Sequence, residues 1–172
     1  WFFETVFAGL RYDDGGVVMT AQMAGLVAGS FAMINLIARP LGGLLSDKMK
    51  SRKMTMLVYM IGITLGFLGM ALIAQYGPVV DGEQTLVPMF DGMGWLVVAV
   101  VITIFCSFFV QGAEGATFAI IPMIKKNMTG QIAGMAGAYG NVGAVIYLVI
   151  YSLVDGKTFF FIVAGGAALS FI

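Results

Sequence analysis

Residues 18–45 read VMTAQMAGLVAGSFAMINLIARPLGGLL, and Arg39 is the only ionised side chain in this stretch. About 20 consecutive apolar residues cross a bilayer as an α-helix, so the stretch predicts a transmembrane span. A charged side chain at membrane depth costs from about 2.5 to more than 10 kcal/mol, depending on the method, and normally faces a cavity or a partner. Arg39 is therefore a candidate anion-binding residue.

The composition is that of a polytopic helical membrane protein. Hydrophobic residues make up 60% of the 172 residues and charged residues only 10%, against about 25% charged in soluble domains. The apolar runs lack the alternation of a membrane barrel. With a formal net charge of zero, a single cysteine (Cys106) and no histidine, we expect no nucleic-acid partner, no internal disulfide, no metal and no cofactor.

Hydropathy divides the chain into several membrane spans. We expect them at about residues 18–45, 54–75, 94–122, 129–153 and 158–172, with residues 1–10 as the end of a preceding helix. Residues 76–93, which are rich in glycine, proline and acids, are expected to form a loop. Because both ends of the chain lie in apolar phrases, we interpret residues 1–172 as part of a longer protein.

Basic side chains gather on one side of these spans. The 47–53 loop and the 123–128 loop hold Lys48, Lys50, Arg52, Lys53, Lys125 and Lys126, whereas the other side has only Arg11 and Lys157. Cytoplasmic loops carry an excess of Lys and Arg. The 47–53 and 123–128 loops are therefore expected to be cytoplasmic, in a multi-pass protein of the plasma or inner membrane.

In the first span, Asn35 lies four residues before Arg39 and shares its helix face. Pro40 removes one backbone hydrogen bond and is expected to strain the helix at the arginine. Two interpretations of Arg39 remain open. It either lines an anion site or extends to the interface near Asp47, about 12 Å further along the helix.

The fourth span contains the run GMAGAYGNVGAVIY, residues 134–147. Gly137 and Asn141 share a helix face, and Gly140 and Gly143 lie to one side of it. A glycine stripe is typical of a close helix contact. Alternatively, it opens space for a small ligand, with the Asn141 amide as donor and acceptor.

The third span contains one carboxylate, Glu114, in QGAEGATFAIIP. A buried carboxylate either stays protonated or pairs with a cation. Three roles stay open: proton coupling, an ion pair with Arg39 or a residue outside this chain, and a structural carboxyl bonded to neighbouring helices.

The phrase ARPLGGLLSDKMKSRK, residues 38–53, resembles the cytoplasmic loop motif of the major facilitator superfamily. Lys50 stands near the place of the motif's later glycine. The resemblance implies a breakable gate between helices, whereas the simpler alternative is positive-inside anchoring. The residues that fit the motif are Gly43, Asp47, Lys48, Arg52 and Lys53.

Three phrases together resemble the nitrate/nitrite porter family of that superfamily: AxxNLxARPLGG, QGAEGATFAIIP and GAYGNVGA, in the order of its C-terminal half. The resemblance implies an all-α C-terminal bundle, from the end of helix seven through most of helix twelve. It also implies that Arg39 is one of two anion-binding arginines, the other lying in the missing N-terminal half. Gly137, Gly140, Asn141 and Gly143 fit the nitrate signature, whereas a role for Glu114 does not carry over.

The expected function is secondary active transport of nitrate or nitrite by alternating access, with proton coupling left open. The substrate-binding candidates are Arg39, Asn35, Asn141, Gly137, Gly140 and Gly143. Two rivals remain: a facilitator for another small anion, and a nitrate-sensing membrane receptor. An enzyme is not expected, because no nucleophile, base and orienting group coincide.

Overall fold

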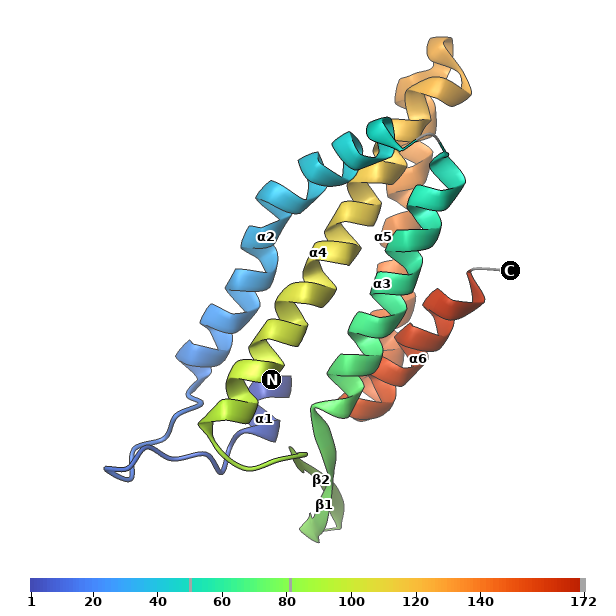
Figure 1. Ribbon diagram of the computed structural model, residues 1–172. Helices are drawn as coiled ribbons and strands as arrows, with labels where there is room; N and C mark the ends of the chain where they lie inside the picture. The colour runs from blue at the N-terminus through green and yellow to red at the C-terminus, as the bar shows by residue number, and fades with distance from the viewer. Residues whose placement is uncertain (50, 81, 171–172) are drawn as a thin grey trace.

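The computed structural model describes residues 1–49, 51–80 and 82–170, and long helices dominate it (Figure 1). Lys50, expected in a cytoplasmic loop, lies outside the described residues, as do Asp81 and residues 171–172. The elements in chain order are α1 (Phe2–Val6), α2 (Ala21–Lys48), α3 (Arg52–Leu72), β1 (Ala74–Val80), β2 (Glu83–Pro88), α4 (Met93–Ile124), the 3-10 turn η1 (Lys126–Met128), α5 (Thr129–Leu153) and α6 (Gly156–Leu169).

Helix α4 lies between α2 and α3 and packs against both (Figure 1). Its contact with α2 is made through small residues, since a Cβ at Gly42 would overlap the Gly112 backbone. Ala38 of α2 and Ala116 of α4 are fully buried. Small residues let membrane helices approach closely, which explains the glycines in both sequence phrases.

The contact between α3 and α4 is asymmetric. Glycines on α3 face residues with side chains on α4, in antiparallel order: Gly62 lies against Phe109, Gly66 against Cys106 and Gly69 against Ile102. At one end of this series the arrangement reverses, and the Tyr59 ring of α3 lies on Gly112 of α4. Gly112 thus admits two neighbours, the α2 backbone and the Tyr59 ring.

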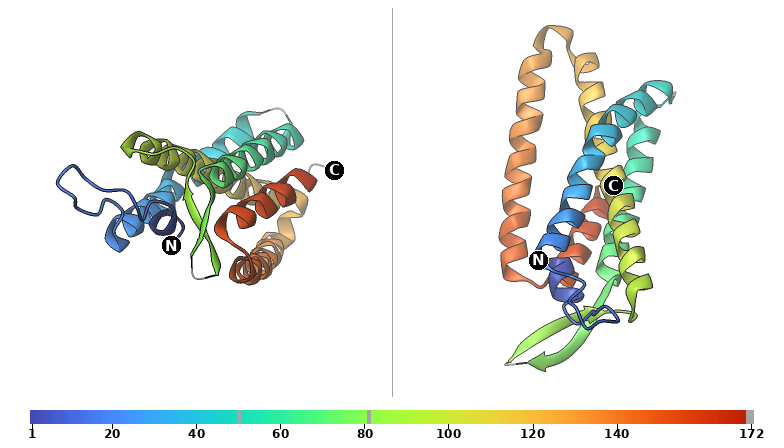
Figure 2. Two further views of the ribbon diagram at one scale, coloured as in Figure 1. Left: turned by 90° about the horizontal axis from the view of Figure 1, so that it is seen from below. Right: turned by 90° about the vertical axis from the view of Figure 1, so that its left-hand side faces the viewer.

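Helices α5 and α6 complete the helical part. Helix α6 packs on α3, whereas α5 stands apart from α2 for most of its length (Figure 2, right). No described residue of α5 is buried. One face of this helix is therefore left without a neighbour within the segment.

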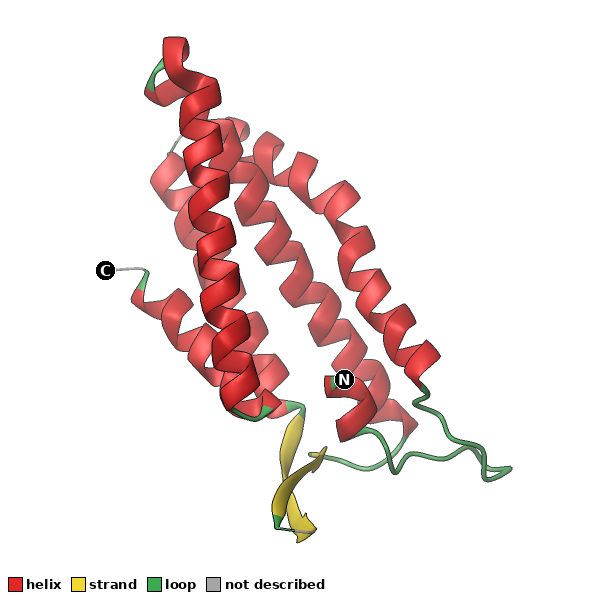
Figure 3. Ribbon diagram, turned by 180° about the vertical axis from the view of Figure 1, so that it is seen from behind, coloured by secondary structure: helices red, strands yellow, loops and turns green. Residues whose placement is uncertain are grey.

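The 76–93 segment, expected to be a loop, is a β-hairpin over most of its length. Strands β1 and β2 pair antiparallel, from Ala74 opposite Pro88 to Val80 opposite Glu83 (Figure 3). The Asp-Gly pair between the strands is a known hairpin signal, and Gly82 has the positive φ (83°) that such a turn requires. The strand also takes residues 74 and 75, which the hydropathy pattern assigned to the second span.

The connections from α2 to α3 and from α4 to α5 lie at one end of the molecule, and the hairpin lies at the other (Figure 1). Within the described residues, four helical segments are long and apolar enough to cross a membrane: Ala21–Lys48, Arg52–Leu72, Met93–Ile124 and Lys126–Leu153. Helix α6 is a shorter apolar helix. The predicted fold class, an all-α membrane protein, is therefore confirmed.

Candidate functional site

Arg39 of α2 forms an ion pair with Glu114 of α4, between Nη2 and Oε1. Of the three roles left open for Glu114, the structure thus shows the ion pair with Arg39. Both side chains remain partly open, with 45% of Arg39 and 39% of Glu114 exposed. The pair therefore lies at the surface of this bundle and is accessible from one side.

The helix backbones fix the position of the pair. The carbonyl of Arg39 lies against Gly115, the residue after Glu114, so closely that a Cβ there would overlap it. Helix α2 continues through Pro40 without a break. The strain expected from Pro40 therefore does not end the helix.

Two polar atoms near this part of the bundle are buried without a hydrogen-bond partner among the described residues, Asn35 Oδ1 and the Tyr59 hydroxyl. Asn35 lies one turn before Arg39, as predicted from its spacing. Tyr59 is 1% exposed, with its hydroxyl beside Gly112. Tyr59 was not among the predicted site residues, although a phenol within an apolar span was a signal in its sequence.

The α5 candidates lie on open surface. Asn141 and Gly140 are exposed, and Gly137 and Gly143 are half-buried. A methyl group on any of these glycines would meet no other atom within 4 Å. The glycine stripe therefore makes no close helix contact within the described segment, and no described hydrogen bond joins Asn141 to Arg39.

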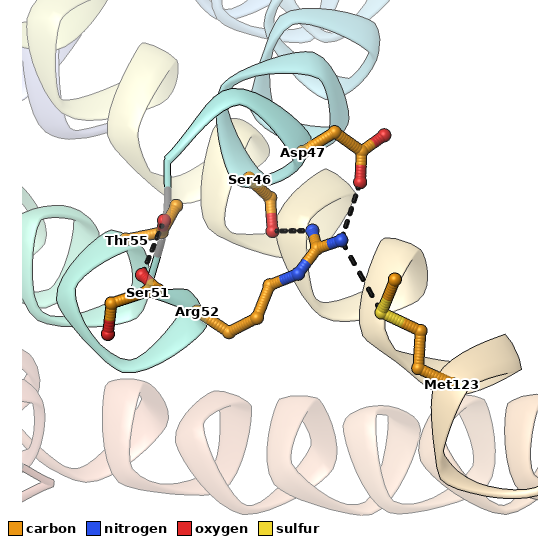
Figure 4. Close-up of polar contacts among 6 residues, drawn as sticks. All are labelled: Ser46, Asp47, Ser51, Arg52, Thr55 and Met123. Atoms are coloured by element: carbon orange, nitrogen blue, oxygen red, sulfur yellow. Dashed lines mark hydrogen bonds and ion pairs between the residues drawn. The ribbon is translucent and has the colours of Figure 1, made fainter.

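The loop motif forms a polar cluster at the α2–α3 end (Figure 4). Arg52 donates to Ser46 Oγ at 2.6 Å and to Asp47 Oδ1 at 2.7 Å, and reaches Met123 Sδ on α4 at 3.4 Å. Ser46 is fully buried. A single guanidinium therefore joins the adjoining ends of three helices.

The other motif residues take different positions. Gly43 faces α4, where a Cβ would lie 3.8 Å from the Gly115 carbonyl oxygen. Lys48 and Lys53 are exposed. The sequence motif did not predict Ser46 or Met123 as partners of Arg52, because serine and methionine are uncharged and are not typical ion-pair partners of arginine.

A second polar cluster joins the hairpin to the start of α6. Asp155 caps α6 by accepting from the backbone N–H groups of Lys157 and Thr158, at 2.9 and 3.0 Å. The Tyr76 hydroxyl of β1 lies 3.0 Å from Thr158 Oγ1, and Lys157 Nζ donates to the Ala74 carbonyl at 2.8 Å. Burial alone would raise the pKa of Asp155, but the bonds from Thr158 and Lys157 hold that pKa below its usual value.

The chain is similar to nitrate transporters from cyanobacteria and plants. It is 47% identical over 142 residues to the nitrate/nitrite transporter NrtP of Picosynechococcus, a match that covers 83% of this chain and 23% of that protein. It is 43% identical over 160 residues to the nitrate/nitrite transporter NrtP of Nostoc punctiforme, a match that covers 92% of this chain and 26% of that protein. It is 38% identical over 130 residues to the high-affinity nitrate transporter 2.3 of rice, a match that covers 76% of this chain and 23% of that protein.

The matches extend along most of the chain, but the chain spans only about a quarter of the length of these curated relatives. No protein-family model matches it, and no solved structure matches it at a comparable level. The relatives are named as transporters, in agreement with the expectation that the chain is not an enzyme. Over most of its length the chain is therefore similar to nitrate/nitrite transporters, which agrees with the resemblance that the three sequence phrases indicated.

Proposed function

We propose that this chain is part of the C-terminal half of a transporter that carries nitrate, nitrite or both across the membrane by alternating access. Arg39 binds the anion, and the N-terminal half supplies the opposite wall of the site. The observation that carries the proposal is a membrane-depth arginine on the accessible side of a close helix contact. The nitrate transporter names of the relatives support the choice of substrate.

The chemistry of Arg39 suits a small planar anion. A guanidinium group donates two parallel hydrogen bonds in one plane, and nitrate and nitrite each present two oxygens in one plane. Asn35 and Asn141 add amide donors. The glycines at 137, 140 and 143 have no side chains, so the α5 backbone can approach the anion closely. The same lack of side chains lets α5 slide against a neighbouring helix during transport.

Alternating access requires contacts that form on one side and break on the other. The Arg52 cluster is a candidate gate, because one side chain joins the ends of α2, α3 and α4. Rocking of two halves around a midplane site is the common scheme for such transporters. We place the 47–53 and 123–128 loops in the cytoplasm and the protein in the plasma or inner membrane.

Uptake by the purified complete transporter in proteoliposomes tests this function. We expect nitrate or nitrite to accumulate, and unlabelled nitrate to compete better than formate, acetate or chloride. Preferred uptake of one of those other anions would identify a different small-anion facilitator. Nitrate binding without uptake would identify a receptor, and the absence of both would contradict the proposal.

A further inference from the structure

We propose that Glu114 is the internal counter-ion that nitrate displaces from Arg39, and that the displaced carboxylate then takes up one proton. The inference rests on the proposed function, since it concerns the same arginine. It assigns to this site a second ligand, the proton, and specifies how anion and proton are linked. The observation that carries it is the Arg39–Glu114 ion pair on the open side of the α2–α4 contact.

The helices cannot easily move apart to release this pair. Gly42 lies directly against the Gly112 backbone, and Gly115 against the Arg39 carbonyl, on the two turns that carry the charges. Separating α2 from α4 would lose this packing. The side chains, in contrast, are partly exposed and end in rotatable bonds. An anion arriving from the open side therefore competes with the Glu114 carboxylate for the guanidinium, while the backbones stay in place.

Among the described residues packed against α4, no cation other than Arg39 is available as an ion-pair partner for Glu114. The facing part of α3 presents Tyr59, which is neutral, and α5 presents Tyr139 but no charged residue between Thr129 and Leu153. Arg52 is already bonded to Ser46 and Asp47. The exposed Lys48, Lys53 and Lys126 lie at the α2–α3 end, with Lys48 about 13 Å along α2 from Arg39.

Charge balance then determines the coupled step. In the empty site, the Arg39 cation and the Glu114 anion sum to zero. In the loaded site, the Arg39 cation holds nitrate, and a proton from solution adds to a Glu114 carboxylate oxygen, so the sum is again zero. A displaced carboxylate that stayed ionised would leave an uncompensated charge at membrane depth, which is strongly unfavourable.

The linkage has a defined sign. Because nitrate binding takes up a proton, nitrate binds most tightly at low pH. Where the empty site is ionised and the loaded site is protonated, the affinity falls by about tenfold per pH unit. A fixed structural ion pair predicts no proton uptake and no such slope.

The test is nitrate titration of the complete transporter from about pH 5 to about pH 8, with calorimetry in two buffers of different ionisation heat to count protons. The wild type should take up close to one proton per nitrate at the upper end of this range. Glu114→Gln should take up none, bind nitrate with a flat pH profile, and bind more tightly than the wild type at high pH. Asp91→Asn, which removes an exposed carboxylate outside the site, should behave as the wild type does.

Nitrate binding without proton uptake by the wild type would overturn the inference, and this measurement needs no variant. A Glu114→Gln protein that keeps the pH slope, or that binds nitrate more weakly at high pH, would also overturn it. If the wild type binds neither nitrate nor nitrite, the proposed function itself fails. The two failures are therefore distinguishable.

Discussion

Few polar side chains of this chain lie near Arg39. Glu114 is its ion-pair partner, and Asn35 lies one turn away with a buried, unbonded side-chain oxygen. A guanidinium has five N–H donors, more than one carboxylate oxygen can occupy. The remaining donors are therefore available to groups outside the described residues.

Asn141 is expected to contribute less than Arg39 to anion binding. A neutral hydrogen bond is worth about 0.5–1.5 kcal/mol and a charged one about 1.5–3, so Asn141→Ala should weaken nitrate binding by roughly three- to tenfold. Nitrate titration of the complete transporter measures this. Asn127→Ala, an exposed amide in η1, is the matched control and should leave the affinity unchanged. An unchanged affinity in Asn141→Ala would remove this residue from the site.

At the scale of elements, the α2–α4 contact is the most demanding part of the fold. Gly42→Ala places a methyl group into the Gly112 backbone and should lower stability by about 1–3 kcal/mol. Gly25→Ala, on the same helix, meets no atom within 4 Å and should be neutral or slightly stabilising, because alanine favours helix. Thermal unfolding of the two variants in detergent compares them. Equal stability of both would contradict the packing described for α2 and α4.

The start of α6 should show a defined pH dependence. The folded protein lowers the pKa of Asp155, so its ionised form adds stability above the ordinary aspartate value of about 4 and loses it as the pH falls further. Asn also caps helices well, so Asp155→Asn removes the charge but keeps the cap. Thermal stability should therefore differ between wild type and Asp155→Asn near neutral pH and converge in acid. Asp13→Asn, in an exposed loop, should show no such convergence; a constant gap in Asp155→Asn would refute the charge effect.

The sequence predicted the helices better than it predicted the hairpin or the contacts between helices. Long apolar runs predicted the helices, because length and hydropathy act locally. The hairpin was missed, since the Asp-Gly turn signal was outweighed by the surrounding glycines and prolines. The pairing of Arg39 with Glu114 was one of three open alternatives, because it depends on how α2 and α4 align. That alignment is set by the packing of Gly42 on Gly112 and of Gly115 on the Arg39 carbonyl.

At the scale of the whole molecule, the two basic connections lie at one end and the hairpin at the other. We expect the basic end to be cytoplasmic. Single cysteines at Lys126 and Lys157, in a Cys106→Ala background, report this through a membrane-impermeant thiol reagent applied to intact cells. Lys157→Cys should be labelled, and Lys126→Cys only after the cells are opened. The reverse pattern would invert the proposed orientation.

The central claim is that Arg39 binds the transported anion directly, and the nitrate affinity of Arg39→Lys in the complete transporter tests it most directly. Lysine keeps the charge but loses the planar two-point fork, so we expect affinity to fall by roughly ten- to a hundredfold, with impaired uptake. Arg11→Lys, a loop arginine bonded to the Ala8 carbonyl, is the control and should bind nitrate normally. Near-normal affinity and uptake in Arg39→Lys would contradict direct binding and leave Arg39 as an anchor that lysine can replace.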